Sequence, residues 1–397
     1  MDGQAIVRLE VKASKRMKRL PAPFYSALMS KANQFIEQGY DVINLAQETP
    51  DLPTPLHIVR SLQDVAENTL NHSYPPLSES RKLKEAICHW YKREQGVDLD
   101  PDHEVAILSG TQTALVQLST TLLNPGDIAL VPDPGYPDYG TGIALAGATM
   151  TPIPLLRENL YLPDLGKITQ NQCERAKIML LNYPSNPTGA CAPASFFDDA
   201  IRFAEKNQIV VANDFAYGAI GFDEKKPISF LSRPGAKEVG IELYSFSKTY
   251  NMAGWGIGFA LGNKKVIRLM NLLQDHFYSS PFGAVQAAAV TALTSSQDCV
   301  RDLVDIYESR RNSLFRDMCK IGWNATLSEG TFFEWLKVPT RYSSIRFADL
   351  LLDKAQVFVA PGIEFGQFGE GYVRVGLLTS EERLREAMRR IQKLSLF

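Results

Sequence analysis

The chain has 397 residues, of which 45% are hydrophobic and 22% are charged. This is ordinary globular composition, and the length exceeds what one compact core usually holds, so we expect a large domain with a smaller one. The net charge of -2 gives no electrostatic reason to expect nucleic acid or an acidic membrane surface as a partner.

Cysteine and histidine usage argues against disulfide and metal chemistry. The five cysteines are odd in number and widely spaced without a CxxC pair, and the five histidines form neither HxxxH nor HExxH. We therefore predict no disulfide framework and no metal site. The sequence shows no signal-peptide core and no apolar run long enough to span a bilayer, so we expect a cytoplasmic protein without a membrane partner.

The N-terminal segment, residues 1–50, is rich in proline and aromatic residues and shows no clear periodicity. Its basic run, Lys12–Arg19, is typical of a solvated arm rather than a nucleic-acid patch. We expect the segment to pack with the small domain or onto a partner subunit.

From about residue 100 to residue 265, short aliphatic runs alternate with amphipathic helical stretches. This alternation predicts an α/β fold with a mostly parallel sheet covered by helices on both faces. The Phe259–Asn263 run is expected to add an edge strand. The main predicted strands are Val105–Gly110, Asp127–Asp133, Lys177–Asn182, Ile209–Asp214 and Glu242–Ser247.

The last hundred or so residues have a different pattern. One long helical stretch, Ala284–Ile321, leads into strand-like runs at Thr331–Val338, Val357–Gly362 and Tyr372–Leu378 that alternate with two further helices. The pattern predicts a smaller α+β domain. We expect the large domain to cover residues 51–285 and the small domain to cover residues 286–397.

Polar residues follow the predicted strands, at the edge where open parallel sheets bind ligands. The first strand runs into Gly110, Thr111 and Gln112 at a helix start, where free N–H groups make either a phosphate cradle or an ordinary cap. After the second strand, Tyr136 lies on a proline-flanked loop. Its ring is expected either to stack on a planar ligand or to fill the core.

The next two strands end in amide and acidic side chains. Asn182 and Asn186 occupy a turn-forming segment, which alone indicates only a turn. Asp214 directly follows an apolar strand, with Tyr217 three residues later. An acid there is costly unless it is paired, and either a pyridinium nitrogen or helix N–H groups would pair it.

Lys248 follows the last of these strands, together with Ser245 and Ser247. Partial shielding from water lowers a lysine pKa and favours Schiff-base and general-base roles. A single lysine there is more often structural. One cofactor site would instead explain the whole series of residues at successive strand ends. The series comprises a phosphate cradle, a stacking ring, hydroxyl-binding groups, an acid and a lysine.

With Asn182–Gly189 (NYPSNPTG) and Ser245–Trp255 (SFSKTYNMAGW), the chain resembles the fold-type-I aminotransferases of class I/II, which depend on pyridoxal 5′-phosphate (PLP). The resemblance extends from Ile43 to Leu384. Within the family, the chain looks most similar to bacterial enzymes that aminate the keto acid of methionine salvage and to transaminases of antibiotic biosynthesis. The resemblance implies a large PLP-binding domain and a smaller α+β domain.

The resemblance also implies roles for individual residues. Lys248 would hold PLP as a Schiff base and shuttle the proton, and Asp214 would keep the pyridine nitrogen protonated. Asn186 and Tyr217 would bind the ring 3′-oxygen, while Tyr136 would stack on the ring. The implied catalytic residues are Lys248, Asp214 and Tyr217.

Further implied contacts concern the phosphate and the substrate. Tyr74 would reach the phosphate of the neighbouring subunit, which implies a homodimer. The residues implied to hold the phosphate within the chain are Gly110, Thr111, Gln112 and Ser245. The residues implied to bind the substrate carboxylate are Arg374, through a bidentate fork, with Asn186 and Ala46.

The chain departs from the family pattern around this site. Gly256 stands where the family has an arginine that pairs the cofactor phosphate, so we expect weaker phosphate binding. Ala46 and Glu48 replace the two glycines of the LGxGxPD segment, which implies a narrowed or recharged substrate pocket. Glu79 replaces a third family glycine, five residues after Tyr74.

The resemblance favours transfer of an amino group between an amino acid and a 2-keto acid. Asp275 stands where dicarboxylate-specific relatives carry an arginine, so we expect a neutral, apolar, aromatic or methionine-like donor. Candidate pocket residues, each equally explained as core, are Phe24, Tyr25, Tyr217, Tyr278 and Phe332.

Two alternatives remain open from the sequence. One keeps PLP for β-lyase, decarboxylase or oxidase chemistry on the same scaffold, and the other is a non-catalytic relative with weakened cofactor binding. Retention of Lys248, Asp214 and Arg374 favours transfer over both.

Overall fold

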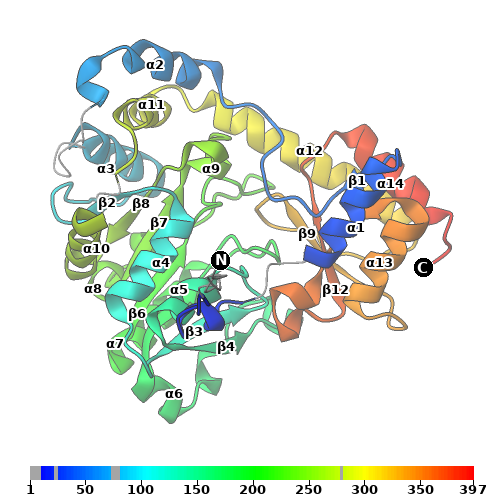
Figure 1. The fold of residues 1–397 in the computed structure, drawn as a ribbon, viewed down its shortest axis with the longest axis horizontal. Helices are drawn as coiled ribbons and strands as arrows, with labels where there is room; N and C mark the ends of the chain where they lie inside the picture. The colour runs from blue at the N-terminus through cyan, green and yellow to red at the C-terminus, as the bar shows by residue number, and fades with distance from the viewer. Residues whose placement is uncertain (1–9, 22–25, 73–80, 278–279) are drawn as a thin grey trace, which may run out of the picture.

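A computed structural model describes residues 10–21, 26–72, 81–277 and 280–397. Two units lie side by side, and helix α12 (Asp298–Lys320) runs from the larger unit toward the smaller one (Figure 1). Among the residues named above, those outside the described ranges are Phe24, Tyr25, Tyr74, Glu79 and Tyr278.

The large unit is built on a seven-stranded sheet with the order β2-β8-β7-β6-β5-β3-β4. Strand β8 is antiparallel to both of its neighbours, while the pairs among β7, β6, β5, β3 and β4 are parallel. The mostly parallel α/β fold is therefore confirmed. The strands are β2 (Val105–Leu108), β3 (Ile128–Asp133), β4 (Thr149–Pro154), β5 (Ala176–Leu181), β6 (Val210–Asp214), β7 (Gly240–Ser245) and β8 (Gly258–Gly262).

The prediction for the Phe259–Asn263 run was wrong in its position. Strand β8 lies inside the sheet, because the chain reverses at Gly256 (φ +62°) and returns between β7 and β2. The actual edge next to β3 is β4, which the sequence did not suggest. Its prolines and mostly solvent-facing residues hide the usual strand pattern, as is common on an edge.

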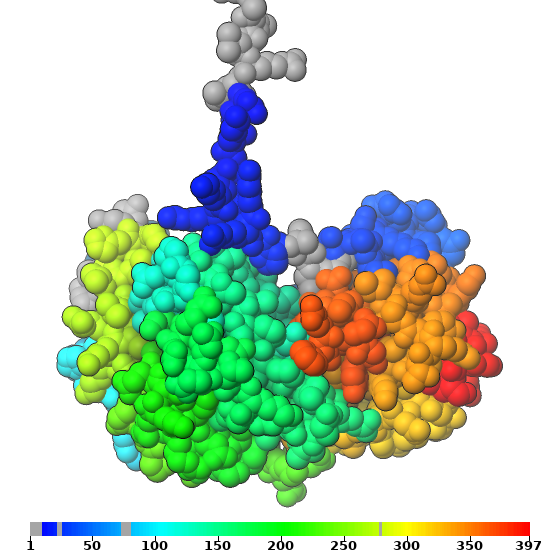
Figure 2. Space-filling view, turned by 90° about the horizontal axis from the view of Figure 1, so that it is seen from below, coloured from blue at the N-terminus to red at the C-terminus, as the bar shows by residue number. Residues whose placement is uncertain are grey.

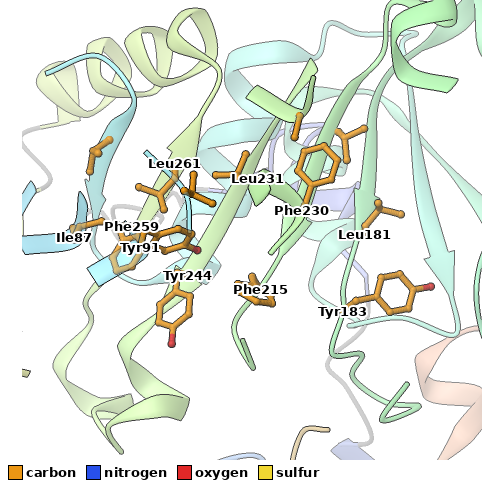
Figure 3. Packing of buried hydrophobic residues seen from close by; sticks show 14 of the residues in the cluster. Ile87, Tyr91, Leu181, Tyr183, Phe215, Phe230, Leu231, Tyr244, Phe259 and Leu261 are labelled. Atoms are coloured by element: carbon orange, nitrogen blue, oxygen red, sulfur yellow. The ribbon is translucent and has the colours of Figure 1, made fainter. Parts of the chain in front are cut away.

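Residues on alternate positions of the strands fill two apolar cores, one on each face of the sheet. Figure 3 shows part of the first core, where Tyr244 stacks on Phe259 with ring centroids 5.1 Å apart. Helices of the first core are α3 (Arg81–Gln95), α7 (Ala194–Asn207) and α11 (Gly283–Thr294), and helices of the second are α4 (Thr111–Leu122), α5 (Tyr139–Ala146) and α10 (Lys264–Phe277). The remaining helices of this unit are α2 (Leu56–Ala66), α6 (Gln170–Arg175), α8 (Ala236–Val239) and α9 (Phe246–Thr249).

The small unit has its own apolar core around a three-stranded antiparallel sheet with the order β11-β12-β9. A two-stranded parallel pair, β1 with β10, brings the N-terminal part of the chain into this unit. Its elements are α1 (Ser26–Glu37), β1 (Ile43–Asn44), β9 (Phe333–Lys337), α13 (Ser344–Ala355), β10 (Val357–Phe358), β11 (Ala360–Pro361), β12 (Tyr372–Gly376) and α14 (Glu381–Gln392). The exact domain boundaries at residues 50 and 285 stay a prediction.

One expectation about the helices was wrong. The Ala284–Ile321 stretch is not one helix but two, α11 and α12, separated by residues 295–297. The Gln297 amide donates to the carbonyls of Ala292 and Ser295, both at 2.9 Å, and so satisfies the end of α11. The N-terminal segment, which lacks clear periodicity, nevertheless contains helix α1. In the described part of the chain, no helix is both long and apolar enough to cross a membrane.

A buried carboxylate links the first core to the sheet. Glu242 on β7 is fully buried and accepts hydrogen bonds from four donors, and burial raises its pKa to about 7. These donors are Tyr91 Oη (2.9 Å), Ser229 Oγ (2.6 Å), Asn213 Nδ2 (2.9 Å) and the Phe230 backbone N–H (2.8 Å).

We expect Tyr91→Phe to lower the free energy of unfolding by about 1–3 kcal/mol, because a buried carboxylate loses one of its donors while the ring packing is kept. Urea unfolding followed by tryptophan fluorescence measures the change. Tyr40→Phe is the matched control, since the Tyr40 side chain is exposed and its hydroxyl should contribute little. Equal unfolding free energies for Tyr91→Phe and the unchanged protein would contradict the role of this bond.

Candidate active site

The sheet register brings the predicted site residues to one edge. Gly258, at the start of β8, pairs with both Leu108 and Ser245, so the ends of β2 and β7 lie on either side of it. Asp214 at the end of β6 pairs with Leu243 of β7. Since parallel strands end at the same edge, the residues that follow β2, β5, β6 and β7 converge there, as expected.

The start of helix α4 forms a candidate anion site. Gly110 precedes the helix with φ +86°, and a Cβ atom on it would meet the Gly256 Cα at 3.9 Å. The Gly256 loop therefore lies directly against the Gly110–Thr111 segment, as the phosphate prediction requires. A Cβ atom on Gly256 would meet no atom of the described residues within 4 Å, so no described side chain fills the space beside the free N–H groups of the helix.

Ser245 and Tyr136 lie on two other segments at this edge. The Ser245 hydroxyl caps α9 by accepting from the Ser247 N–H at 3.1 Å, which leaves its own proton available for an anion. The half-buried Tyr136 donates to Asp138 at 3.0 Å, and Gln112 donates to the same carboxylate at 2.6 Å. Gln112 thus fixes the loop that carries the Tyr136 ring.

Asp214 is buried and lacks a hydrogen-bonded cationic side chain in the described part of the chain. Tyr139 donates its hydroxyl proton to the Asp214 carboxylate at 2.9 Å, and the Ala216 N–H donates at 3.2 Å. Burial nevertheless raises the pKa of Asp214 to about 6. Sequence reasoning missed Tyr139, although its position three residues after Tyr136 at a helix start was a usable signal.

Lys248 lies one turn beyond the end of β7, in the short helix α9. Its amino group donates to the backbone carbonyl of Glu48 at 2.8 Å and lies 5.5 Å from the centroid of the Phe332 ring. Burial lowers the pKa of Lys248 to about 8, against the opposing effects of the Glu48 and Asp214 carboxylates. A partly neutral amine is therefore present near neutral pH.

Arg374, on β12 of the small unit, is fully buried. It donates to the Asn186 side-chain oxygen at 2.8 Å and to the Ala46 carbonyl at 3.0 Å. The guanidinium lies 3.9 Å from the ring centroid of Phe333, which screens one face. The three residues predicted to bind a substrate carboxylate thus form one hydrogen-bonded group, although their role stays a prediction.

Tyr217 and Phe332 line the same region. Both are buried, and their rings meet edge to face at a centroid distance of 5.3 Å. The Tyr217 hydroxyl hydrogen-bonds Asn186, and burial raises the pKa of Tyr217 well above its usual value. These two predicted pocket residues therefore form an aromatic wall beside Lys248.

Glu48 has a partner that the sequence did not reveal. Its carboxylate accepts from the Arg374 guanidinium at 2.7 Å, so an acid of the chain already occupies the predicted carboxylate site. The sequence marked Glu48 only as an unusual residue that recharges the pocket.

Among the described residues, no group of three or more His, Cys, Asp or Glu side chains is placed to hold a metal ion. All five cysteines are free.

The sequence and fold match known proteins over nearly their whole length. Residues 40–391 match the family model described as aminotransferase class I and II. The chain is 54% identical over 381 residues to L-glutamine--4-(methylsulfanyl)-2-oxobutanoate aminotransferase of Bacillus subtilis, with 96% of each chain covered. It is 40% identical to an LL-diaminopimelate aminotransferase of Halothermothrix orenii, covering 95% of this chain and 97% of the relative.

A solved structure agrees with this similarity. The substrate-bound structure of BacF from Bacillus subtilis superposes with a TM-score of 0.93 at 45% identity, covering 98% of each chain. A curated relative from the same organism is named transaminase BacF.

We expect reductive alkylation of Lys248 by formaldehyde and borohydride to become faster with rising pH, with half of the maximal rate near pH 8. The reason is that only the neutral amine attacks an aldehyde, and burial lowers the pKa of Lys248 to about 8. Mass spectrometry of the Lys248 peptide measures the rate, and the exposed Lys12 serves as reference for reagent decay. A rate that still climbs tenfold per pH unit between pH 9 and 10 would contradict the lowered pKa.

Proposed function

The chain belongs to the class I and II aminotransferases, which use PLP, and we propose that it moves the amino group of a neutral amino acid to a 2-keto acid. The observation that carries this proposal is the grouping of Lys248, Asp214 and Asn186 with the buried Arg374 at one edge of the sheet. An amine, an acid and a carboxylate-binding cation are the groups that the reaction requires.

The residues present fit PLP. Asp214 is a buried acid without a hydrogen-bonded cation in the described ranges, and its raised pKa shows that an ionised carboxylate is disfavoured there. A protonated pyridine nitrogen would supply the missing positive charge. The Gly110–Thr111 helix start and the open space at Gly256 suit a phosphate. Lys248, Asp214, Asn186, Tyr217 and Ser245 would hold the cofactor, with Tyr136 against its ring.

When bound, PLP supplies an electron sink that acidifies the α-proton of an amino donor. Lys248 Nζ, with a pKa near 8, accepts that proton, since an amine with a pKa close to the working pH is an effective base. Asp214 would hold a proton on the ring nitrogen. Asn186 and Tyr217, which hydrogen-bond each other, orient the ring oxygen.

Arg374 would bind the α-carboxylate of the donor. Its Nε atom is buried and has no hydrogen-bond partner among the described residues, so the guanidinium retains a donor for a ligand. Asn186 accepts from Arg374 through its oxygen, and beside its contact with Tyr217 its amide group keeps one proton for the ring oxygen or the carboxylate.

The donor side chain is proposed to be neutral and methionine-like or aromatic. Tyr217 and Phe332 provide a buried aromatic surface next to Lys248, which suits an apolar or sulfur-containing group. Asp275, on the last turn of α10, is exposed and acidic, so it offers no cation for a second carboxylate. The name of the 54% identical relative, which includes a methylsulfanyl keto acid, supports the same class.

We propose a homodimer on two observations. The first described residues extend away from the body of the molecule, where they have few partners of their own chain (Figure 2). Three large apolar side chains near helix α11 are also exposed, namely Leu70, Phe277 and Phe282. Sedimentation velocity tests the proposal, since it separates a species of one chain from a species of two.

An absorbance screen of amino acids against the PLP-loaded protein tests the function. We expect methionine or an aromatic amino acid to convert the visible band of the bound cofactor to the band of its amine form, and a 2-keto acid to reverse the change. Aspartate should react at least tenfold more slowly, because the acidic Asp275 stands where a cation would be needed to pair a second carboxylate. Release of ammonia or pyruvate without a keto-acid requirement would instead favour lyase chemistry.

We expect Gly256→Arg to tighten PLP binding about ten- to a hundredfold, because a guanidinium beside the α4 start adds a charge-assisted hydrogen bond of about 1.5–3 kcal/mol. Fluorescence titration of the cofactor-free protein with PLP measures the dissociation constant.

Gly256→Ala is the matched control. A side chain at Gly256 (φ +62°) strains the backbone in both variants, which lowers stability by about 1–2 kcal/mol. Only the arginine should change the PLP dissociation constant. An unchanged constant in Gly256→Arg would refute the placement of the phosphate at this loop.

A further inference from the structure

The Glu48 side chain forms an ion pair with Arg374 inside the candidate site. Its carboxylate accepts from Arg374 Nη1 at 2.7 Å, and the same nitrogen donates to Asn186 at 2.8 Å. Arg374 is completely buried, whereas the Glu48 side chain is 29% exposed. One member of the pair is therefore fixed in the small unit, while the other reaches in from a face that solvent can enter.

The backbone around Glu48 is held independently of this ion pair. Three residues further on, Asp51 makes a bidentate pair with Arg310, both contacts at 2.9 Å. On the other side, the Ala46 N–H donates to the Asn44 side chain at 2.9 Å, and the Ala46 carbonyl accepts from Arg374. The segment has anchors before and after Glu48, so the carboxylate can leave Arg374 by side-chain rotation alone.

The ion pair changes what an incoming ligand meets. With Glu48 in place, the guanidinium charge is already neutralised, and a second carboxylate at the same position would face a like charge. A ligand carboxylate that displaces Glu48 would take over the Nη1 contact, so the two carboxylates compete for the same donor.

We propose that Glu48 is a specificity-determining residue, a built-in carboxylate that competes with the substrate carboxylate for Arg374. The proposal rests on the function proposed above, because it takes Arg374 as the substrate-binding cation. The competition makes every substrate displace an internal ligand. It thereby discriminates against ligands whose remaining contacts, such as those to the aromatic wall of Tyr217 and Phe332, are too weak to drive the exchange.

The test compares two unreactive ligands with the same carbon skeleton, the charged 3-phenylpropanoate and the neutral 3-phenylpropanamide. Isothermal titration of the PLP-loaded protein measures both dissociation constants. We expect Glu48→Gln to bind the carboxylate about ten- to a hundredfold more tightly than the unchanged protein does, because a charged competitor is removed. The affinity for the amide should change by less than about threefold.

Two controls separate competition from other effects. Glu158→Gln removes an exposed acid elsewhere on the chain and should leave both affinities unchanged. Asp51→Asn loosens the same segment without clearing Arg374, so any change it causes should be equal for the two ligands. A Glu48→Gln protein whose carboxylate affinity is unchanged or weaker would overturn the proposal, and so would an equal gain for both ligands.

The same preparations distinguish this proposal from the proposed function. If amino acids convert the bound cofactor in all variants but Glu48→Gln gains no carboxylate affinity, the competition is wrong and the aminotransferase assignment stands. If no variant converts the cofactor with any amino acid, the function proposed above is wrong. A gain in carboxylate affinity under those conditions would still show that Glu48 competes with ligand carboxylates for Arg374.

Discussion

A buried arginine joins the two units of this protein. Arg374 lies on β12 of the small unit, yet its guanidinium donates to the Glu48 carboxylate, to Asn186 of the large unit and to the backbone of Ala46. Because an unpaired buried guanidinium is very costly, contact between these segments stabilises Arg374 in its buried position. The candidate site is thus a consequence of the contact between the units rather than a feature of either one.

Burial shifts the two titratable groups at the cofactor position in opposite directions. The pKa of Asp214 rises to about 6 and that of Lys248 falls to about 8, since low polarity disfavours both charged forms. A cofactor with a protonatable ring nitrogen and a reactive carbonyl would relieve both effects, because it offers a positive partner to the acid and a covalent partner to the amine. The burial that disfavours the charged forms of Asp214 and Lys248 therefore favours binding of such a cofactor.

The sequence predicted the sheet and the order of the site residues, because both depend on short-range patterns. Apolar runs and the residues that follow them placed Gly110, Asp214 and Lys248 at one edge without knowledge of the structure. It did not predict that β8 lies inside the sheet, because an antiparallel return through Gly256 leaves no periodic signal. The Glu48–Arg374 pair was equally hidden, since 326 positions separate the two residues and only the folded small unit brings them together.

The central claim is that Arg374 exchanges an internal carboxylate for that of the substrate. A crystal structure of the PLP-loaded protein with 3-phenylpropanoate tests it most directly. The account predicts the ligand carboxylate within hydrogen-bond distance of Arg374 Nη1, and the Glu48 carboxylate rotated out of hydrogen-bond distance. A structure in which Glu48 still pairs with Arg374 while the ligand carboxylate binds elsewhere would contradict it.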